Sequence, residues 1–209
     1  MARPPNTSAR REQIARGLLS VMAEKGYDRA TTVDVAEAAE LSRGVLHYHF
    51  DSKLEILLFL IDLYVAEHVA VLEEHLDRDG GNPVAQVRTF ITVHVSAGDA
   101  EPTKLMCWIA FGAEALREPS VQKKYQAALA LWVERLTQII RAGIAKKVFK
   151  CKPAAASAAG AAIVAAIQGY LHIGATTDYG SVIPEMSGAI SVLAMAEGLL
   201  GARILERRS

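Results

Sequence analysis

The chain has 209 residues, of which 51% are hydrophobic and 22% charged, and its 23 basic side chains balance its 23 acidic ones. A neutral chain does not coat nucleic acid or an anionic membrane through bulk charge, so only a local basic patch remains. Two cysteines do not make a disulfide framework, and residues 1–12 lack the apolar stretch of a signal peptide. We expect a cytoplasmic protein, whose basic patch is an N-terminal arm carrying Arg3, Arg10 and Arg11.

The first three predicted elements are helices, because apolar residues recur at helical spacing and cap residues flank them. The first covers residues 8–25 and ends at Gly26. A short second helix, through residue 39, begins at Thr31, where Asp34 completes a capping box. Ser42 is the N-cap candidate of a third short helix, which follows a tight turn. Two short helices in this arrangement are typical of a helix-turn-helix.

The remaining elements are also helical, which gives an all-α fold of about nine helices. Ser52 with Glu55 forms a second capping box before a long helix that ends near residue 76. Residues 153–177 contain no charged side chain and are long enough to cross a bilayer, but they are mostly Ala and Gly. A soluble helix that packs closely is preferred to a membrane span. The other predicted helices cover about 83–96, 103–117, 120–147, 154–176 and 184–204, with loops at 97–102 and 178–184.

Between residues 14 and 57 the chain contains, in order, EKGY (24–27), TTV (31–33), VAEAA (35–39), LSRGVLHYHF (41–50) and Ser52 with Lys53. In these segments it resembles the DNA-binding domain of the TetR family of transcription regulators. Two residues depart from the family pattern. Glu40 stands where the turn usually has Gly, and a non-Gly residue in the left-handed region costs about 1 kcal/mol. His47 stands where Tyr is commoner, which we expect to change sequence preference.

The resemblance implies a DNA-binding domain at residues 1–52 and a ligand-binding and dimerisation domain at 53–209. It also implies which side chains contact DNA. Arg43 is the strongest candidate to contact a base, since its guanidinium can donate two bonds to guanine. We expect Arg43, Gly44, Val45 and His47 to face base edges, and Thr32, Ser42, Tyr48, His49 and Lys53 to contact phosphates. His47 and His49, two apart on a helix, diverge, so no metal site is expected.

Residues 103–146 and 153–184 resemble, more loosely, the C-terminal domain of the BetI-like subgroup, in KLMCWIAF (104–111), Pro119 and AIQGY (166–170). This implies an effector pocket and a dimer built from the last two helices. A cation held by aromatic rings and a neutral apolar effector both fit the composition. The pocket candidates are Tyr64, His94, Trp108, Phe111, Glu114, Tyr125, Trp132 and Tyr170, with ordinary core packing as the alternative. The dimer candidates are Ala158, Ala162, Ala166, Gly169, Leu193, Ala196 and Leu200.

The sequence therefore predicts a homodimeric TetR-type regulator that binds a palindromic operator in double-stranded DNA and is released by a small-molecule effector. Repression is favoured over activation. No cofactor and no enzymatic activity are expected, since Cys107 and His94 form no recognisable nucleophile motif. The alternatives are a redox-responsive regulator that uses Cys107 and a membrane-associated helical protein. The operator, the regulated genes and the effector do not follow from the sequence.

Overall fold

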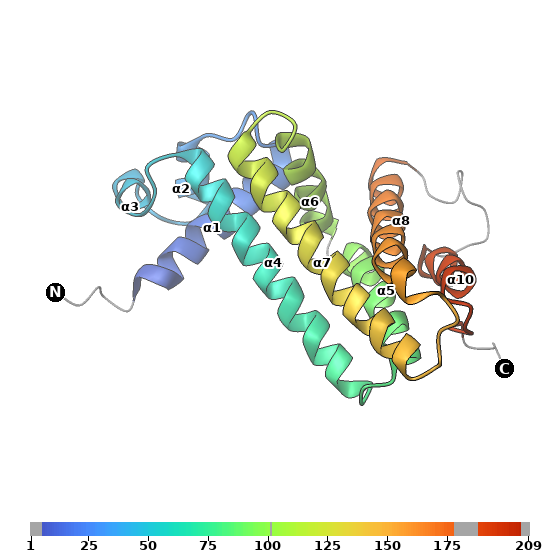
Figure 1. The fold of residues 1–209 in the computed structure, drawn as a ribbon. Helices are drawn as coiled ribbons and strands as arrows, with labels where there is room; N and C mark the ends of the chain where they lie inside the picture. Colours follow the sequence, from blue (N-terminus) through green and yellow to red (C-terminus); the bar gives the residue numbers. More distant parts are fainter. Residues whose placement is uncertain (1–5, 101, 178–187, 206–209) are drawn as a thin grey trace. The chain divides into compact units, whose positions relative to one another are not determined.

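A computed structural model describes residues 6–100, 102–177 and 188–205. The described residues are helical throughout, with nine α-helices and one short 3-10 helix, which confirms the predicted all-α class (Figure 1). The elements are α1 (Asn6–Lys25), α2 (Thr32–Ala38), α3 (Arg43–His49), α4 (Lys53–Arg78), α5 (Pro83–Ala100), α6 (Pro102–Glu114), α7 (Pro119–Ala145), η1 (Pro153–Ala155), α8 (Ala156–Thr176) and α10 (Gly188–Leu200).

The chain divides into two compact units. The head unit comprises residues 1–67 and 103–126, and the body unit comprises 68–102 and 127–209. Helices α4 and α7 each contribute their first part to the head unit and the rest to the body unit. The sequence predicts a boundary after residue 52 between a DNA-binding domain and a ligand-binding and dimerisation domain. The two compact units are defined by packing and not by function, so that boundary stays a prediction.

The capping residues predicted for the three N-terminal helices are in place, while α1 begins at Asn6, two residues before its predicted start, and α2 ends at Ala38, one residue before its predicted end. Gly26 follows α1 with φ 80°, a left-handed conformation that glycine adopts without strain. The Thr31 hydroxyl accepts from the backbone N–H of Asp34, while the Asp34 carboxylate accepts from that of Thr31, so the capping box is complete. Ser42 caps α3 by accepting from the backbone N–H of Val45 at 3.3 Å.

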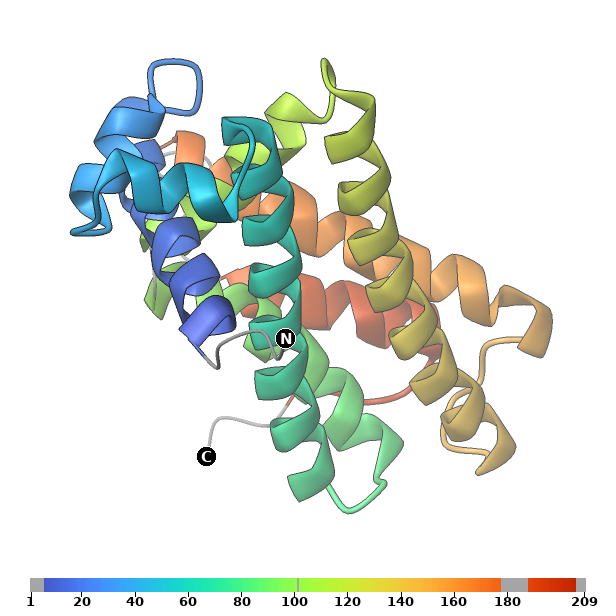
Figure 2. The same cartoon turned by 90° about the vertical axis from the view of Figure 1, so that its left-hand side faces the viewer.

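Helices α1, α2 and α3 pack on one another, and Figure 2 shows them gathered beside the first turns of α4. The crossing of α1 and α2 is close because Gly17 has no side chain. A Cβ atom at this position would lie 2.8 Å from the carbonyl oxygen of Val35 and 3.0 Å from Cβ of Ala39. Backbone atoms of a neighbouring helix have little freedom to move away, so this contact fixes the packing of the two helices.

In the turn between α2 and α3, Glu40 adopts the strained left-handed backbone conformation that the sequence predicts there. Glu40 has φ 55°, and its side chain is exposed. We expect Glu40→Gly to raise the free energy of unfolding by about 1 kcal/mol, since glycine removes the clash of Cβ in the left-handed region. Urea unfolding of the full chain measures the change. Glu40→Ala removes the carboxylate and keeps the strained backbone, so an equal gain in that variant would assign the effect to charge instead.

One predicted loop is wrong. The sequence predicts that residues 97–102 separate two helices, but α5 continues to Ala100 and α6 begins at Pro102. A single glycine in a helix costs about 1 kcal/mol, which tertiary packing overrides. Proline at the first helical position costs little, because that N–H has no partner within the helix. Elsewhere the predicted helix ends differ by a few residues, and the predicted loop at 178–184 lies outside the described residues.

In the body unit, α10 packs against α5 and α8. The chain after α10 is held by the Arg88 guanidinium, which donates to the carbonyl of Ile204 at 2.7 and 2.8 Å. Residues 153–176 form the one described helical stretch that is long and apolar enough to cross a membrane, and a third of it is buried within the chain. Such a stretch is weak evidence for a span, since a core helix of a soluble protein meets the same criteria.

Candidate nucleic-acid interface

Helix α3 buries Leu46, leaves His49 half-buried and exposes its other residues. The four residues expected to face bases, Arg43, Gly44, Val45 and His47, are all exposed. Tyr48 is 77% exposed, which is unusual for a large ring in a folded domain. A short, capped helix whose exposed residues include the donors Arg43, His47 and Tyr48 matches the geometry of a helix that enters the major groove.

Four of the five residues expected to contact phosphate are at least partly accessible to solvent. Ser42 and Tyr48 are exposed, and Thr32 and His49 are half-buried. Thr32 begins α2 beside Thr31, whose own hydroxyl is occupied by the capping box. These four side chains lie at the surface of the head unit, and their contact with phosphate stays a prediction.

Lys53 is engaged inside the head unit. Its Nζ donates to the carbonyl oxygens of Tyr27 at 2.8 Å and Ala30 at 2.9 Å, and it lies 4.1 Å from the centre of the Tyr27 ring. Two of its three donors are therefore used to tie the α1–α2 turn to the start of α4. The sequence signal for a phosphate contact at Lys53 was the family resemblance alone, which did not reveal this structural role.

Arg11 joins three helices at the end of α3. Its guanidinium donates to the backbone carbonyl of His49 at 2.7 Å and to the Glu55 carboxylate at 3.1 Å. It also lies 4.0 Å from the centre of the Phe50 ring and 4.9 Å from that of Phe59. The Glu55 carboxylate accepts from the backbone N–H of Asp51, which with Arg11 lowers the pKa of Glu55. This network fixes the corner between α3 and α4.

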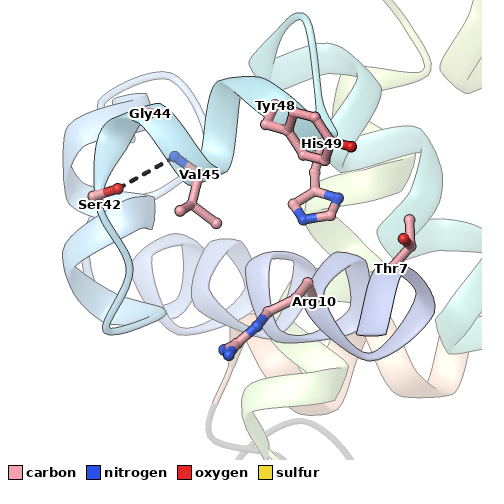
Figure 3. Close-up of a pocket in the computed structure, with 7 residues that line it drawn as sticks. All are labelled: Thr7, Arg10, Ser42, Gly44, Val45, Tyr48 and His49. Atoms are coloured by element: carbon pink, nitrogen blue, oxygen red, sulfur yellow. Dashed lines mark hydrogen bonds between the residues drawn. The ribbon is translucent and has the colours of Figure 1, made fainter. Parts of the chain in front are cut away.

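A hollow of about 410 Å³ lies between α1 and α3 (Figure 3). Thr7 and Arg10 line it from α1, and the side chains of Val45 and His49 point toward α1 from α3. Arg10 and Arg11 belong to α1, so the predicted helix over residues 8–25 holds for both and the expected basic arm does not, while Arg3 lies outside the described residues. The full lining is Thr7, Arg10, Ser42, Gly44, Val45, Tyr48 and His49.

The candidate pocket residues fall into separate clusters. In the head unit, Trp108 stacks with Tyr64 and Tyr125 at ring distances of 5.3 and 4.6 Å, and Phe111 packs edge-on to Tyr64. Glu114 is half-buried near Tyr27, where burial and then the charge of Glu114 raise the pKa of that tyrosine to about 12.

In the body unit, His94 and Trp132 are buried and their ring centres lie 5.2 Å apart. His68, which sequence reasoning did not single out, packs against both rings. Tyr170 is half-buried, and its ring fills the space where a side chain at Gly188 would lie. The structure thus gives these residues close aromatic neighbours, and their contact with an effector stays a prediction.

The cysteine alternatives are weakened by burial. Cys107 is 1% exposed, and its thiol donates to the carbonyl of Leu19 at 3.6 Å. Burial raises the pKa of Cys107 to about 11, so the reactive thiolate is scarce at neutral pH. Within the described part of the chain, no three His, Cys, Asp or Glu side chains group closely enough to hold a metal ion.

The candidate dimer residues divide by exposure. On α8, Ala158, Ala162 and Gly169 are exposed and Ala166 is half-buried, so this stripe of small residues is open to a second helix. On α10, the three candidates are already buried within the body unit against other parts of the chain. They are Leu193, Ala196 and Leu200.

Comparison with known proteins shows to which family the chain belongs. Residues 14–59 match the profile of "bacterial regulatory proteins, tetR family", and residues 83–178 match that of the "BetI-type transcriptional repressor, C-terminal". The chain belongs to the tetR family, with a BetI-type C-terminal region. Among curated relatives, the regulator BetI of Stenotrophomonas maltophilia is 24% identical over 118 residues, which are 56% of this chain and 60% of BetI. The repressor IcaR of Staphylococcus aureus is 37% identical over 46 residues, 22% of this chain and 25% of IcaR.

Solved structures of tetR-family regulators share the fold. A TetR regulator from Haloarcula marismortui superimposes with a TM-score of 0.78 at 15% identity, covering 93% of this chain and 97% of its own. A transcriptional regulator from Saccharomonospora viridis, in complex with choline, gives 0.74 at 18% identity, covering 96% of this chain and all of its own. The two family profiles that the chain matches describe transcription regulators, which are not enzymes. The match to the curated BetI proteins spans about 60% of their length.

Proposed function

We propose that the chain is a DNA-binding transcription regulator that acts as a homodimer on a palindromic operator. The observation that carries the proposal is the exposure of Arg43, Gly44, Val45 and His47 on a short helix capped by Ser42. The helix is held from behind by Leu46 in the core and by Arg11 at its last carbonyl. A rigid helix that presents donors in this way suits direct contact with base edges.

Each base-contacting residue has a distinct role in this proposal. Arg43 donates two hydrogen bonds to O6 and N7 of a guanine. Val45, which is 36% exposed, contacts a thymine methyl group, and His47 donates to or accepts from a base edge. A Cβ atom at Gly44 would meet no atom closer than 3.9 Å, so packing does not require a glycine here, and its small size instead leaves room for close approach of the DNA.

The dimer brings two such helices to successive major grooves, about one helical turn apart. We propose that the exposed stripe of Ala158, Ala162 and Gly169 on α8 packs against a second copy, together with the exposed edge of α10 at Leu199. Small residues allow two helices to approach closely, and a two-fold interface uses the same patch on both copies.

We propose that regulation is repression relieved by a small-molecule effector, as the BetI-type C-terminal region suggests. The effector must bind the conformation that does not fit DNA more tightly, because equal affinity for both conformations shifts nothing. The change would reach the recognition helix through α4, which begins directly after the corner that Arg11 holds. Choline, bound by one structural neighbour, is the first compound to titrate against the protein–DNA complex.

The experiment that tests the function is selection of bound duplexes from a randomised pool with the full chain. We expect a palindrome whose half-sites lie about one helical turn apart. Failure of well-folded protein to enrich any sequence would contradict the proposal.

On the selected operator, we expect Arg43→Ala to cost about 1 to 3 kcal/mol and to relax preference at one base position in each half-site. The reason is that the guanine would lose its bidentate donor. Competition titrations with operators substituted at single positions measure the effect. The matched control is Arg29→Ala, which removes an exposed arginine of the head unit whose Nε donates to the carbonyl of Lys25. If both variants lose the same affinity for operator and for random duplex, Arg43 contacts no base.

A further inference from the structure

The segment that joins α7 to α8 carries the densest group of basic side chains in the sequence (Figure 1). Four lysines fall within residues 146–152, and no Asp or Glu occurs between residues 135 and 177. The lysines are Lys146, Lys147, Lys150 and Lys152, and all four are exposed. Because the chain as a whole is neutral, this segment is a local basic patch, and residues 146–155 are called the basic turn below.

The four lysines of the basic turn carry charges that the protein does not neutralise. Lys25, Lys104 and Lys124 each form an ion pair with a carboxylate. Among the residues that the structure describes, no such pair includes a lysine of the basic turn. Lys146 donates to the carbonyl of Gly81 at 2.7 Å, which holds its side chain without cancelling its charge. The basic turn therefore presents uncompensated positive charge to solvent.

The backbone of the basic turn is fixed by its neighbours. The N–H groups of Val148 and Phe149 donate to the carbonyl of Gly143 at 2.9 and 3.2 Å. The Phe149 ring is buried against Gly143, where a Cβ atom would lie 2.1 Å from the ring. The N–H of Lys150 donates to the carbonyl of Leu200 at 2.8 Å, which ties the turn to the end of α10. A partner therefore meets a preformed surface, and little backbone entropy is lost on binding.

The surface around the lysines is apolar. Val148 is 37% exposed, and residues 153–155, a proline and two alanines, are exposed as well. Residues 139–156 contain no Ser, Thr, Asn, Gln, His, Tyr or Trp. Surfaces that bind nucleic acid use such hydroxyl, amide and aromatic groups beside their Lys and Arg. Lysines mixed with small apolar side chains suit instead the boundary of a bilayer, where ammonium groups meet lipid phosphates and apolar groups leave water.

We propose that the basic turn docks on the surface of an anionic phospholipid bilayer. Its four ammonium groups bind headgroup phosphates, and Val148 and Pro153 lie at the level of the headgroups. The attraction is local, because at 0.1 M salt a charge acts over about 10 Å and the chain has no net charge. Helix α8 stays packed against α10 in the body unit, so the protein adsorbs to the bilayer and does not span it. This binding goes beyond the proposed regulatory function and does not depend on it.

Sedimentation of the full chain with vesicles tests the proposal. We expect binding to vesicles of equal parts phosphatidylglycerol and phosphatidylcholine, and none to phosphatidylcholine alone. Raising the salt to about 1 M, where the screening length is about 3 Å, should release the protein. Three results would each overturn the proposal: no binding to the anionic vesicles, equal binding to both lipids, or retention in high salt, which indicates insertion of an apolar helix.

Two substitutions on the basic turn measure its contribution. Lys147→Gln combined with Lys150→Gln should weaken binding to the anionic vesicles roughly 25-fold, since each lysine near a charged bilayer contributes about fivefold. The matched control combines Arg117→Gln with Lys123→Gln, which removes two exposed charges of the head unit and should bind as the unaltered chain does. Val148→Ser should weaken binding without changing its salt dependence. Far-ultraviolet circular dichroism checks that each variant keeps its helices, and an equal loss in the control would assign binding to net charge and overturn the docking site.

Titration of the same variants with random duplex DNA separates the two polyanions. A loss that is confined to the vesicles supports the lipid surface. If the Lys147→Gln and Lys150→Gln pair loses as much affinity for random duplex as for vesicles, the basic turn binds nucleic acid and the proposal of a lipid partner is wrong.

Discussion

Arg11→Met is expected to weaken operator binding by about 2 kcal/mol, roughly thirtyfold, with no change in salt slope. The substitution removes the donor to the His49 carbonyl, the partner of Glu55 and the cation beside Phe50. Methionine fills similar volume but leaves a half-buried carboxylate and the last carbonyl of α3 without their partner. The proposed recognition helix then loses its fixed angle to α4, although the residues expected to contact phosphate are unchanged.

Binding titrations at several salt concentrations separate this positioning role from charge loss. Arg16→Met is the matched control on the same helix, because Arg16 is exposed and pairs at the surface with Glu67. Surface pairs contribute about 0 to 1 kcal/mol, so the control should bind nearly as tightly as the unaltered chain. Arg11→Lys should recover only part of the loss. A guanidinium presents several N–H donors in one plane and reaches both the His49 carbonyl and the Glu55 carboxylate, whereas the compact ammonium of lysine does not reproduce that geometry. A shallower salt slope for Arg11→Met would instead make Arg11 a phosphate contact.

Local signals predicted the head unit well because its helices are bounded by residues with specific backbone chemistry. Thr31 and Ser42 are N-caps and Gly26 takes the left-handed conformation, as expected from the sequence. Glu40 has the strained φ that its place in the turn implied. These effects act within four residues of chain, so no knowledge of tertiary structure is needed to predict them.

Contacts between distant residues could not be predicted in the same way. Arg11 and Glu55 are 44 residues apart, and Lys53 bonds a carbonyl 26 residues away, so their roles depend on how the helices pack. Residues 1–11 contain no acid, which suggested a basic N-terminal arm, whereas the predicted helix over residues 8–25 already included Arg10 and Arg11. The structure agrees with the helix, since α1 extends from Asn6 to Lys25.

The aromatic residues illustrate a second limit of sequence reasoning. Helical spacing placed Trp108 and Phe111 on one face, and the structure confirms that their rings pack together. Spacing alone could not divide the candidates between two compact units or add His68 to His94 and Trp132. Burial in a monomer and contact with an effector require the same apolar side chains, so composition does not separate them.

The histidine at the centre of the body unit leads to the second large prediction, a loss of stability in mild acid. His94 is 4% exposed, and its Nδ1 lies 2.7 Å from the carbonyl oxygen of Phe90. A carbonyl only accepts, so Nδ1 carries the proton, and the buried Nε2 has no hydrogen-bond partner among the described residues. The ring packs against His68 of α4, Phe90 of α5 and Trp132 of α7.

Protonation of this ring opposes folding. Burial, and then the neighbouring His68, lowers the pKa of His94 from 6.5 to about 3. The unfolded chain therefore takes up this proton at a higher pH than the folded chain does. The contribution of His94 to stability is fully present above pH 6.5 and is lost as the pH falls from 6.5 toward 3, by about 1.4 kcal/mol for each pH unit.

Urea unfolding at pH 7.5, 6.5, 5.5 and 4.5 measures the slope. We expect the unaltered chain to lose stability steeply between pH 6.5 and 5.5, a range above the ordinary carboxyl pKa values. His94→Gln, which keeps a polar side chain of similar size, should be less stable at pH 7.5 but lose less stability on acidification. His172→Gln, an exposed histidine of α8, should follow the unaltered chain. Parallel curves for the unaltered chain and His94→Gln would mean that His94 takes up its proton equally in both states, and that its burial does not govern acid stability.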